Sequence, residues 1–173
     1  MIIRKATVLG AGVMGSQIAA LLVNAGLKVE LLDVVIDQED PNKLSKAGYD
    51  RITNPKKSML FDLDLAANLT YGNYDEQLKE ASDSDIFIEA VKEDLEIKHD
   101  VWGKVAKVAK KEAILATNTS GIPINLIAKV FSKEDKKRFV GLHFFNPPRF
   151  MKLVEIIPNQ ETSEEVIKQV TEF

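Results

Sequence analysis

The stretch Gly10-Ala11-Gly12-Val13-Met14-Gly15 decides the fold, because it fits the pattern G-x-G-x-x-G between a short apolar run at 6–9 and an Ala-, Leu- and Ile-rich segment at 13–24. In α/β proteins this pattern joins a strand to a helix at a dinucleotide site. Glycine lets the backbone turn sharply and approach a pyrophosphate, which free N–H groups and the helix dipole stabilise. The alternative is a tight turn without a ligand. The residues predicted to bind the cofactor here are Gly10, Gly12, Val13, Met14 and Gly15.

Asp33 lies 18 residues after Gly15, at the end of the next predicted strand, 28–33. A carboxylate at this position accepts hydrogen bonds from ribose hydroxyls and repels a 2′-phosphate. The following Val34-Val35-Ile36 offers no arginine to receive such a phosphate. We therefore expect NAD rather than NADP as the cofactor, with an ordinary strand-end carboxylate as the alternative for Asp33.

Short apolar runs alternate with longer amphipathic stretches along the whole chain, which predicts βαβ units on a parallel sheet. We expect a single α/β domain over 1–173, of the Rossmann type, with a doubly wound, mostly parallel sheet and helices on both faces. A longer, polar excursion at about 34–68 should contain one or two short helices. The later strands are predicted at 69–71, 85–91, 113–116, 139–145 and 153–157, with helices at 95–111 and 124–131 among others.

Composition excludes several classes of function. The 173 residues carry a net charge of −3, which argues against a broad nucleic-acid interface, and no apolar run is long enough for a membrane span. The absence of cysteine excludes disulfides and thiolate metal sites, and His99, the histidine other than His143, has no matching ligand spacing, so no metal site is expected. A cytoplasmic location is the default expectation.

The last segment, 162–173, predicts an amphipathic helix. Thr162 and Glu165 form a capping-box pattern, and Val166, Val170 and Phe173 share one face. The sequence stops while this face is still apolar. We expect an incomplete fragment, or a first domain whose neighbour covers that face, and association through the face if it is exposed.

Polar residues follow the predicted strand at 113–116. Asn118-Thr119-Ser120-Gly121 should lie at the carboxyl edge of the sheet, where ligands bind in open α/β folds. No G-x-S-x-G elbow surrounds Ser120, so a hydrogen bond to a substrate oxygen is a better functional interpretation than nucleophilic attack. Capping of the helix that follows is an equally good explanation.

His143 and Glu155 stand on two predicted strands, joined by a turn that contains Pro147 and Pro148. Adjacent strands connected in this way can bring an imidazole and a carboxylate together. Such a pair acts as a general base, since the carboxylate fixes the tautomer of the histidine and stabilises the imidazolium. From spacing alone, a core histidine and a solvent-facing glutamate explain the pattern at least as well.

The combination of GAGVMG, NTSG and GLHFFNPPRFMKLVEII resembles the NAD-binding domain of the 3-hydroxyacyl-CoA dehydrogenases of fatty-acid β-oxidation, over nearly the whole chain. The resemblance implies NAD-dependent oxidation of 3-hydroxyacyl-CoA to 3-oxoacyl-CoA. It implies a general base, its carboxylate partner and a residue that holds the substrate oxygen, at His143, Glu155 and Ser120 in that order. It also implies cofactor contacts near the nicotinamide from Asn146, and near its ribose from Glu93 and Lys98, for which a solvated helix start is the alternative.

The sequence departs from the family in two ways. Gly121 replaces the second serine of the usual N-T-S-S turn, and the family's helical carboxyl-terminal domain, which provides dimer contacts and a further catalytic asparagine, has no counterpart here. The resemblance implies an acyl-CoA substrate and a homodimeric or larger full-length parent. The segment 43–57 carries five basic residues, and in the family this region lies near coenzyme A. A solvated helix face is the alternative explanation for these bases, which are Lys43, Lys46, Arg51, Lys56 and Lys57.

Two other functions stay open. One is a non-catalytic NAD- or CoA-binding module of a larger protein, because an isolated domain lacks groups that would complete an active site. The other is a β-hydroxyacid dehydrogenase acting on free acids. That class typically relies on a catalytic lysine, whereas this sequence offers His143 and Glu155.

Overall fold

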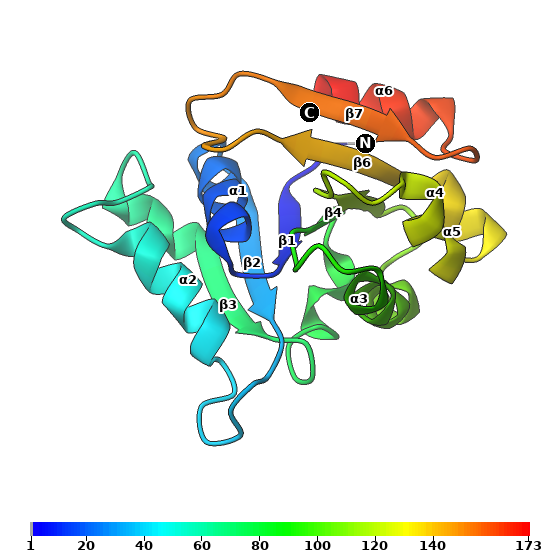
Figure 1. Ribbon diagram of the computed structural model, residues 1–173. Coiled ribbons are helices and arrows are strands. Elements are labelled where there is room, and N and C mark those ends of the chain that lie inside the picture. Colours follow the sequence, from blue (N-terminus) through cyan, green and yellow to red (C-terminus); the bar gives the residue numbers. More distant parts are fainter. Residues whose placement is uncertain (1) are drawn as a thin grey trace.

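A seven-stranded sheet forms the centre of the molecule in the computed structural model, which describes residues 2–173 (Figure 1). The strand order is β3-β2-β1-β4-β5-β6-β7; the first six strands are parallel, and β7 runs antiparallel to β6. The predicted class, a doubly wound and mostly parallel α/β sheet, is confirmed. The strands are β1 (Lys5–Leu9), β2 (Lys28–Asp33), β3 (Leu69–Asn73), β4 (Ile86–Glu89), β5 (Ile114–Thr117), β6 (Phe139–Phe144) and β7 (Val154–Pro158).

Helices cover both faces of the sheet, and each face has its own hydrophobic core. Alternate strand residues point to opposite faces, so Ile86 and Ile88 belong to the core beneath α1, α2 and α6, whereas Phe87 belongs to the core beneath α3 and α4 with Trp102. The helices are α1 (Val13–Asn24), α2 (Lys43–Thr53), α3 (Leu95–Val108), α4 (Ile124–Ile127), α5 (Lys133–Lys137) and α6 (Glu164–Glu172), with 3₁₀ turns η1 (Leu63–Asn68), η2 (Glu80–Asp83) and η3 (Ala128–Val130).

The expected excursion at 34–68 contains α2 and η1, as predicted, and the helix predicted at 124–131 divides into α4 and η3. The start of α6 differs from the prediction. Ser163 is the N-cap, and its Oγ accepts a hydrogen bond from the N–H of Val166. Thr162 donates instead to the carbonyl of Phe139 at 2.7 Å, because the chain before α6 is tied to β6.

The apolar face of α6 is not free for association, which corrects the expectation from the sequence. Val166 and Val170 are 8% and 6% exposed and belong to the core that also contains Val140 and Leu142 of β6. Of the three residues on the predicted face, Phe173 is exposed. The helix folds back on its own sheet, which a pattern read along the chain cannot distinguish from a surface awaiting a partner.

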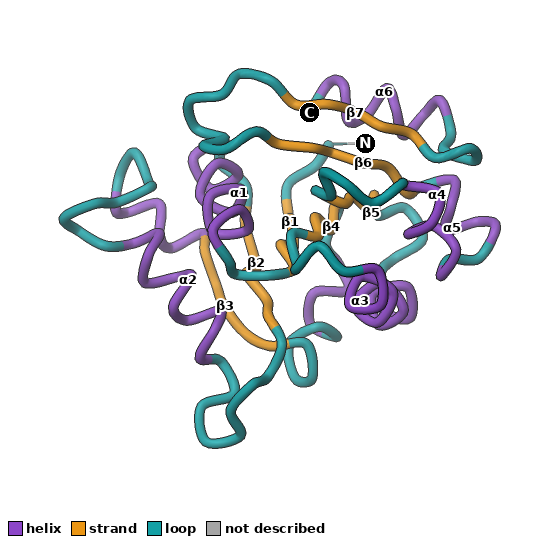
Figure 2. Tube along the Cα trace, in the orientation of Figure 1, coloured by secondary structure: helices purple, strands orange, loops and turns teal. Residues whose placement is uncertain are grey.

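The carboxyl ends of the parallel strands meet at one edge, and the candidate site residues follow these ends. The loops after β1, β4 and β5 gather there between α1 and α3 (Figure 2). Since β7 is antiparallel to β6, the beginning of β7 reaches the same edge. Within residues 2–173, no helix combines the length and the apolar character that crossing a membrane requires.

Candidate functional site

The glycine turn after β1 packs tightly against neighbouring backbone at Gly10 and Gly15 and is open at Gly12. Gly10 has φ +97°, and a Cβ there would lie 2.8 Å from the carbonyl oxygen of Ala90. At Gly15 a Cβ would lie 1.7 Å from the carbonyl oxygen of Gly10, so α1 could not approach the strand. A Cβ on Gly12 would meet nothing within 4 Å. The first and third glycines therefore permit the turn, and the second leaves room for a ligand.

The amino terminus of α1 suits an anion. Gly12 is its N-cap and has no side chain to accept from the first N–H groups, which lack intrahelical partners. The first turn carries no acidic residue. The open N–H groups and the helix dipole thus suit a pyrophosphate, and contacts from Val13 and Met14 to the cofactor remain a prediction.

Asp33 ends β2 beside this turn. Its Oδ2 accepts from the N–H of Ala11 and its Oδ1 from the N–H of Val34, both at 2.7 Å. Burial raises the pKa of Asp33, while these two hydrogen bonds act in the opposite direction. Each carboxylate oxygen retains capacity for another donor. The carboxylate is thus held in place for ribose hydroxyls, and that contact itself remains a prediction.

A cavity of about 650 Å³ opens between α2 and α3 in front of the turn. Gly10, Gly12 and Asp33 form one side of it. The volume and the largely apolar walls fit the adenosine half of a dinucleotide. Its apolar wall comes from Val34, Leu44, Ala47, Ile97 and Val101.

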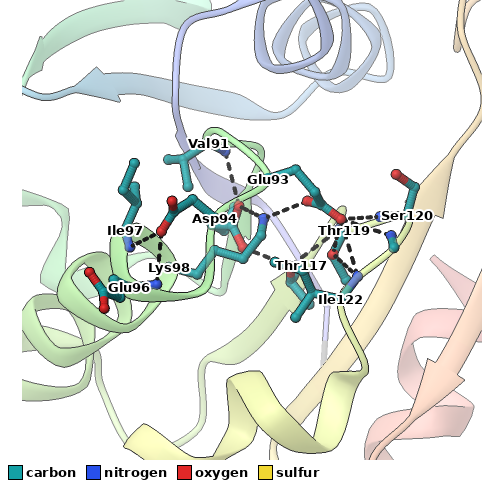
Figure 3. A network of polar contacts seen from close by, with 12 residues as sticks. Val91, Glu93, Asp94, Glu96, Ile97, Lys98, Thr117, Thr119, Ser120 and Ile122 are labelled. Carbon is teal, nitrogen blue, oxygen red and sulfur yellow. Dashed lines mark hydrogen bonds and ion pairs between the residues drawn. The ribbon is translucent and has the colours of Figure 1, made fainter.

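A buried ion-pair network follows β4. The Nζ of Lys98 lies 2.7 Å from Oε1 of Glu89. It also lies 3.2 Å from Oε2 of Glu93, toward which it points in Figure 3. Lys98 is 1% exposed and Glu89 is fully buried, and Glu89 also accepts from the hydroxyl of Thr117 at 2.6 Å. A solvated helix start is therefore wrong for Lys98. A charge in the interior requires such partners, so the two carboxylates fix this lysine.

Glu93 connects this network to the loop that carries Ser120. Its Oε1 accepts from the Thr119 hydroxyl and from the N–H of Ser120 at 3.0 Å (Figure 3). The same oxygen accepts from the N–H of Gly121 at 2.8 Å. Burial alone would raise the pKa of Glu93, but the hydrogen bonds from Thr119 and Gly121 and the charge of Lys98 lower it to about 2. Glu93 is thus ionised at neutral pH and holds the backbone of Ser120, whose side chain stays exposed.

Asn118 fixes the same loop to β6. Its Oδ1 accepts from the N–H of Phe144 at 2.8 Å, and its own N–H donates to the carbonyl of Glu89 at 2.8 Å. Phe144 directly follows His143. The Ser120 loop, β4 and the end of β6 are therefore coupled through one asparagine.

The structure brings His143 and Glu155 together. They are register partners on β6 and β7, and Nδ1 of His143 donates to Oε2 of Glu155 at 2.8 Å. The His143 side chain is 20% exposed and that of Glu155 is 50% exposed, so the pair is open to solvent on the glutamate side. The ring of Phe145 lies 4.7 Å from the imidazole. The predicted adjacency is confirmed, and the alternative of a core histidine is wrong.

Asn146 is exposed at the start of the β6–β7 connection. Its Oδ1 accepts from Nε2 of Gln17, on α1, at 3.1 Å. This contact ties the connection to the helix that begins at the glycine turn. Among residues 2–173, no direct hydrogen bond links Ser120, His143 and Asn146 to one another.

The sequence analysis missed three contributors: Glu89, Asn118 as a tether, and Arg51 as part of the cavity. The sequence did contain a signal for Glu89, since it is the single charged residue in the apolar run at 86–91. Arg51 had none, because α2 places it beside the glycine turn 40 residues earlier in the chain. In the described part of the chain, no group of three or more His, Cys, Asp or Glu could hold a metal, and Nε2 of His99 contacts the carbonyl of Leu126.

Comparison with known proteins agrees with this geometry. A family model described as "3-hydroxyacyl-CoA dehydrogenase, NAD binding domain" matches residues 5–173. A protein of Deinococcus radiodurans named "Probable 3-hydroxyacyl-CoA dehydrogenase" is 48% identical over 174 residues, which cover 100% of this chain and 50% of that protein. The chain thus spans half the length of this relative.

Solved structures show the same relation. The crystal structure of M. tuberculosis FadB2 aligns with a TM-score of 0.84 at 32% identity, covering 100% of this chain and 60% of that one. The 3-hydroxybutyryl-CoA dehydrogenase of Escherichia coli aligns with a TM-score of 0.81 at 30% identity, covering 99% of this chain and 36% of that one. The chain therefore belongs to the 3-hydroxyacyl-CoA dehydrogenase family and contains its NAD-binding domain.

Proposed function

We propose that this chain is the NAD-binding part of an enzyme that oxidises 3-hydroxyacyl-CoA to 3-oxoacyl-CoA in fatty-acid β-oxidation. The observation that carries the proposal is the His143–Glu155 pair at 2.8 Å, on the sheet edge that also presents the glycine turn and the Ser120 loop. Family membership gives the cofactor, NAD. The His143–Glu155 pair supplies the general base of the proposed reaction.

His143 takes the proton of the substrate hydroxyl in this proposal. Because Nδ1–H donates to Glu155, the neutral ring carries its lone pair on Nε2, and Nε2 is the atom that accepts the proton. Glu155 then stabilises the imidazolium. General-base assistance of this kind contributes about 10²–10⁴ in rate.

The other predicted residues orient the reactants. Ser120 donates its hydroxyl to the substrate oxygen, on a backbone that Glu93 holds at 3.0 Å. Asn146 contacts the nicotinamide region and Glu93 contacts its ribose, whereas Lys98, 1% exposed, acts on this site by holding Glu93 at 3.2 Å. NAD, when bound, supplies the acceptor for the hydride that leaves C3.

The remaining assignments concern context. We propose an acyl-CoA substrate, a longer natural protein of which this chain is an incomplete part, a homodimeric or larger parent, and a cytoplasmic location. The chain's 50% coverage of the Deinococcus relative supports the second point. Of the five bases considered for coenzyme A, Lys43 pairs with Asp37 at 3.0 Å and Arg51 faces the NAD cavity. The others, Lys46, Lys56 and Lys57, are exposed.

The test measures NAD binding and turnover separately. The chain is titrated with NAD, and NADH consumption with acetoacetyl-CoA is followed for the chain and for a longer natural protein that contains it. We expect binding by both and turnover by the longer protein. Turnover by neither, with NAD bound by both, would contradict the proposed reaction.

A non-catalytic NAD-binding module of a larger protein is the second candidate. The observation that favours it is the chain's coverage of half of a relative, since the chain alone then holds only part of the length over which an active site could be built. The same assay separates the two, because a module of this kind binds NAD in every context and supports no turnover in any.

A further inference from the structure

Arg51 reaches from α2 to the carbonyl side of the glycine turn. Its Nη1 donates to Oγ of Ser16 at 2.8 Å, to the carbonyl of Ala11 at 3.3 Å and to the carbonyl of Gly12 at 3.4 Å. Ser16 is fully buried, and its hydroxyl donates in turn to the carbonyl of Ala11 at 3.0 Å. One guanidinium nitrogen therefore touches both residues that follow Gly10.

The position of Arg51 is fixed by the way α2 packs. Ile52 is fully buried, and a Cβ on Gly48 would lie 2.9 Å from Cβ of Ala11, so α2 sits directly against the turn. Leu44, Ala47 and Arg51 line the cavity from one face of α2, as the spacing i, i+3, i+7 requires. The side chain thus extends from a rigid helix.

The charge of Arg51 is not cancelled nearby. Within residues 2–173, no carboxylate lies at ion-pair distance from its guanidinium, unlike Lys43, which pairs with Asp37. Its three hydrogen bonds all use Nη1, and a guanidinium has five N–H donors. Arg51 therefore retains both a net positive charge and donor capacity at the wall of the cavity.

We propose that Arg51 is a positioning residue for the pyrophosphate of NAD. By holding the carbonyl oxygens of Ala11 and Gly12, it keeps the opposite, N–H side of these peptide groups directed at the phosphates. Its uncompensated charge also lowers the energy of the dianionic pyrophosphate at the end of α1. This assignment rests on NAD binding and not on the proposed reaction.

The experiment titrates the 173-residue chain with NAD, ADP and adenosine by calorimetry. The variants are Arg51→Met and Arg51→Lys, with Lys57→Met as the matched control, because Lys57 is an exposed base of the same segment. Arg51→Met should weaken NAD and ADP binding by roughly 10-fold or more, as expected for a lost charge-assisted contact. Adenosine binding should change by less than about 2-fold, and Arg51→Lys should recover part of the loss because the charge remains.

The salt dependence of binding adds a readout that a purely structural role would not change. The affinity for NAD should fall less steeply with salt in Arg51→Met than in the unaltered chain. Equal NAD affinity of Arg51→Met and the unaltered chain would overturn the proposal, and so would an equal loss for adenosine and ADP. These titrations measure NAD binding and not turnover. A failure of the proposed reaction would therefore leave their result unchanged, whereas a failure of the Arg51 assignment would change it.

Discussion

Replacement of Glu93 by glutamine tests the network that holds the Ser120 loop. The change keeps the shape of the side chain and an acceptor oxygen but removes the charge that faces Thr119, Ser120 and Gly121. Lys98 keeps its contact with Glu89 at 2.7 Å, so the interior does not gain an unpaired charge. The effect therefore reports the carboxylate of Glu93.

The expected loss follows from the type of hydrogen bond. A bond to a charged acceptor contributes about 1.5–3 kcal/mol and a neutral one about 0.5–1.5 kcal/mol. Because the donors share one oxygen and the side chain of Glu93 is 40% exposed, solvent screening reduces the total to about 1–2 kcal/mol. For a chain of this length that lowers Tm by roughly 2–8 °C at pH 7.

The pH dependence gives the sharper test. The pKa of Glu93 is about 2 in the folded chain, below its ordinary value of 4.5, so its stabilisation is fully present above pH 4.5 and is lost as pH falls toward 2. The difference in Tm between the unaltered chain and Glu93→Gln should therefore shrink over that window, as measured by circular dichroism. Glu112→Gln is the control, since Glu112 is exposed. A difference that stays constant down to pH 2.5, or none at pH 7, would refute the reasoning.

Three other changes have clear expected outcomes. Lys98→Met leaves Glu89 buried without its cation and should lower the free energy of unfolding by about 3–5 kcal/mol in denaturant titration; a loss below about 1 kcal/mol would contradict the buried ion pair. Gly15→Ala places a methyl group 1.7 Å from a backbone oxygen and should cost about 3 kcal/mol or more, whereas Gly103→Ala in α3 meets nothing closer than 3.7 Å and should be neutral or stabilising; similar stabilities would show that the turn can relax. Glu155→Gln should lower turnover of a longer natural protein that contains the chain at least about 10-fold with NAD affinity retained, and unchanged turnover would remove Glu155 from the site.

Local patterns were sufficient to predict the sheet and the glycine turn, whereas spacing left the His143–Glu155 contact as one of two explanations and the family resemblance favoured it. Short apolar runs define the strands, and the Pro147-Pro148 turn connects β6 and β7 so that the histidine and the glutamate meet. These features depend on residues close in sequence or on periodicity. Features of this kind can therefore be predicted from the order of residues along the chain.

The features that could not be predicted depend on distant contacts. Lys98 lies in the first turn of α3, where a lysine is usually solvated. In the structure it is buried and forms an ion pair with Glu89 on β4. Arg51 belongs to a basic segment that resembles a surface patch, and the packing of α2 against α1 brings its side chain to the glycine turn. The apolar face of α6 covers its own sheet for the same reason: the sequence does not state which surface a helix will meet.

The measurement that tests the central claim most directly is NADH oxidation with acetoacetyl-CoA by a longer natural protein that contains this chain, compared with its His143→Ala variant. In this direction, the reverse of the proposed oxidation, protonated His143 donates the proton to the 3-oxygen, and the account predicts a fall in turnover of at least about 100-fold in His143→Ala, with NAD affinity within about 2-fold of the unaltered protein. Unchanged turnover in His143→Ala would contradict the account.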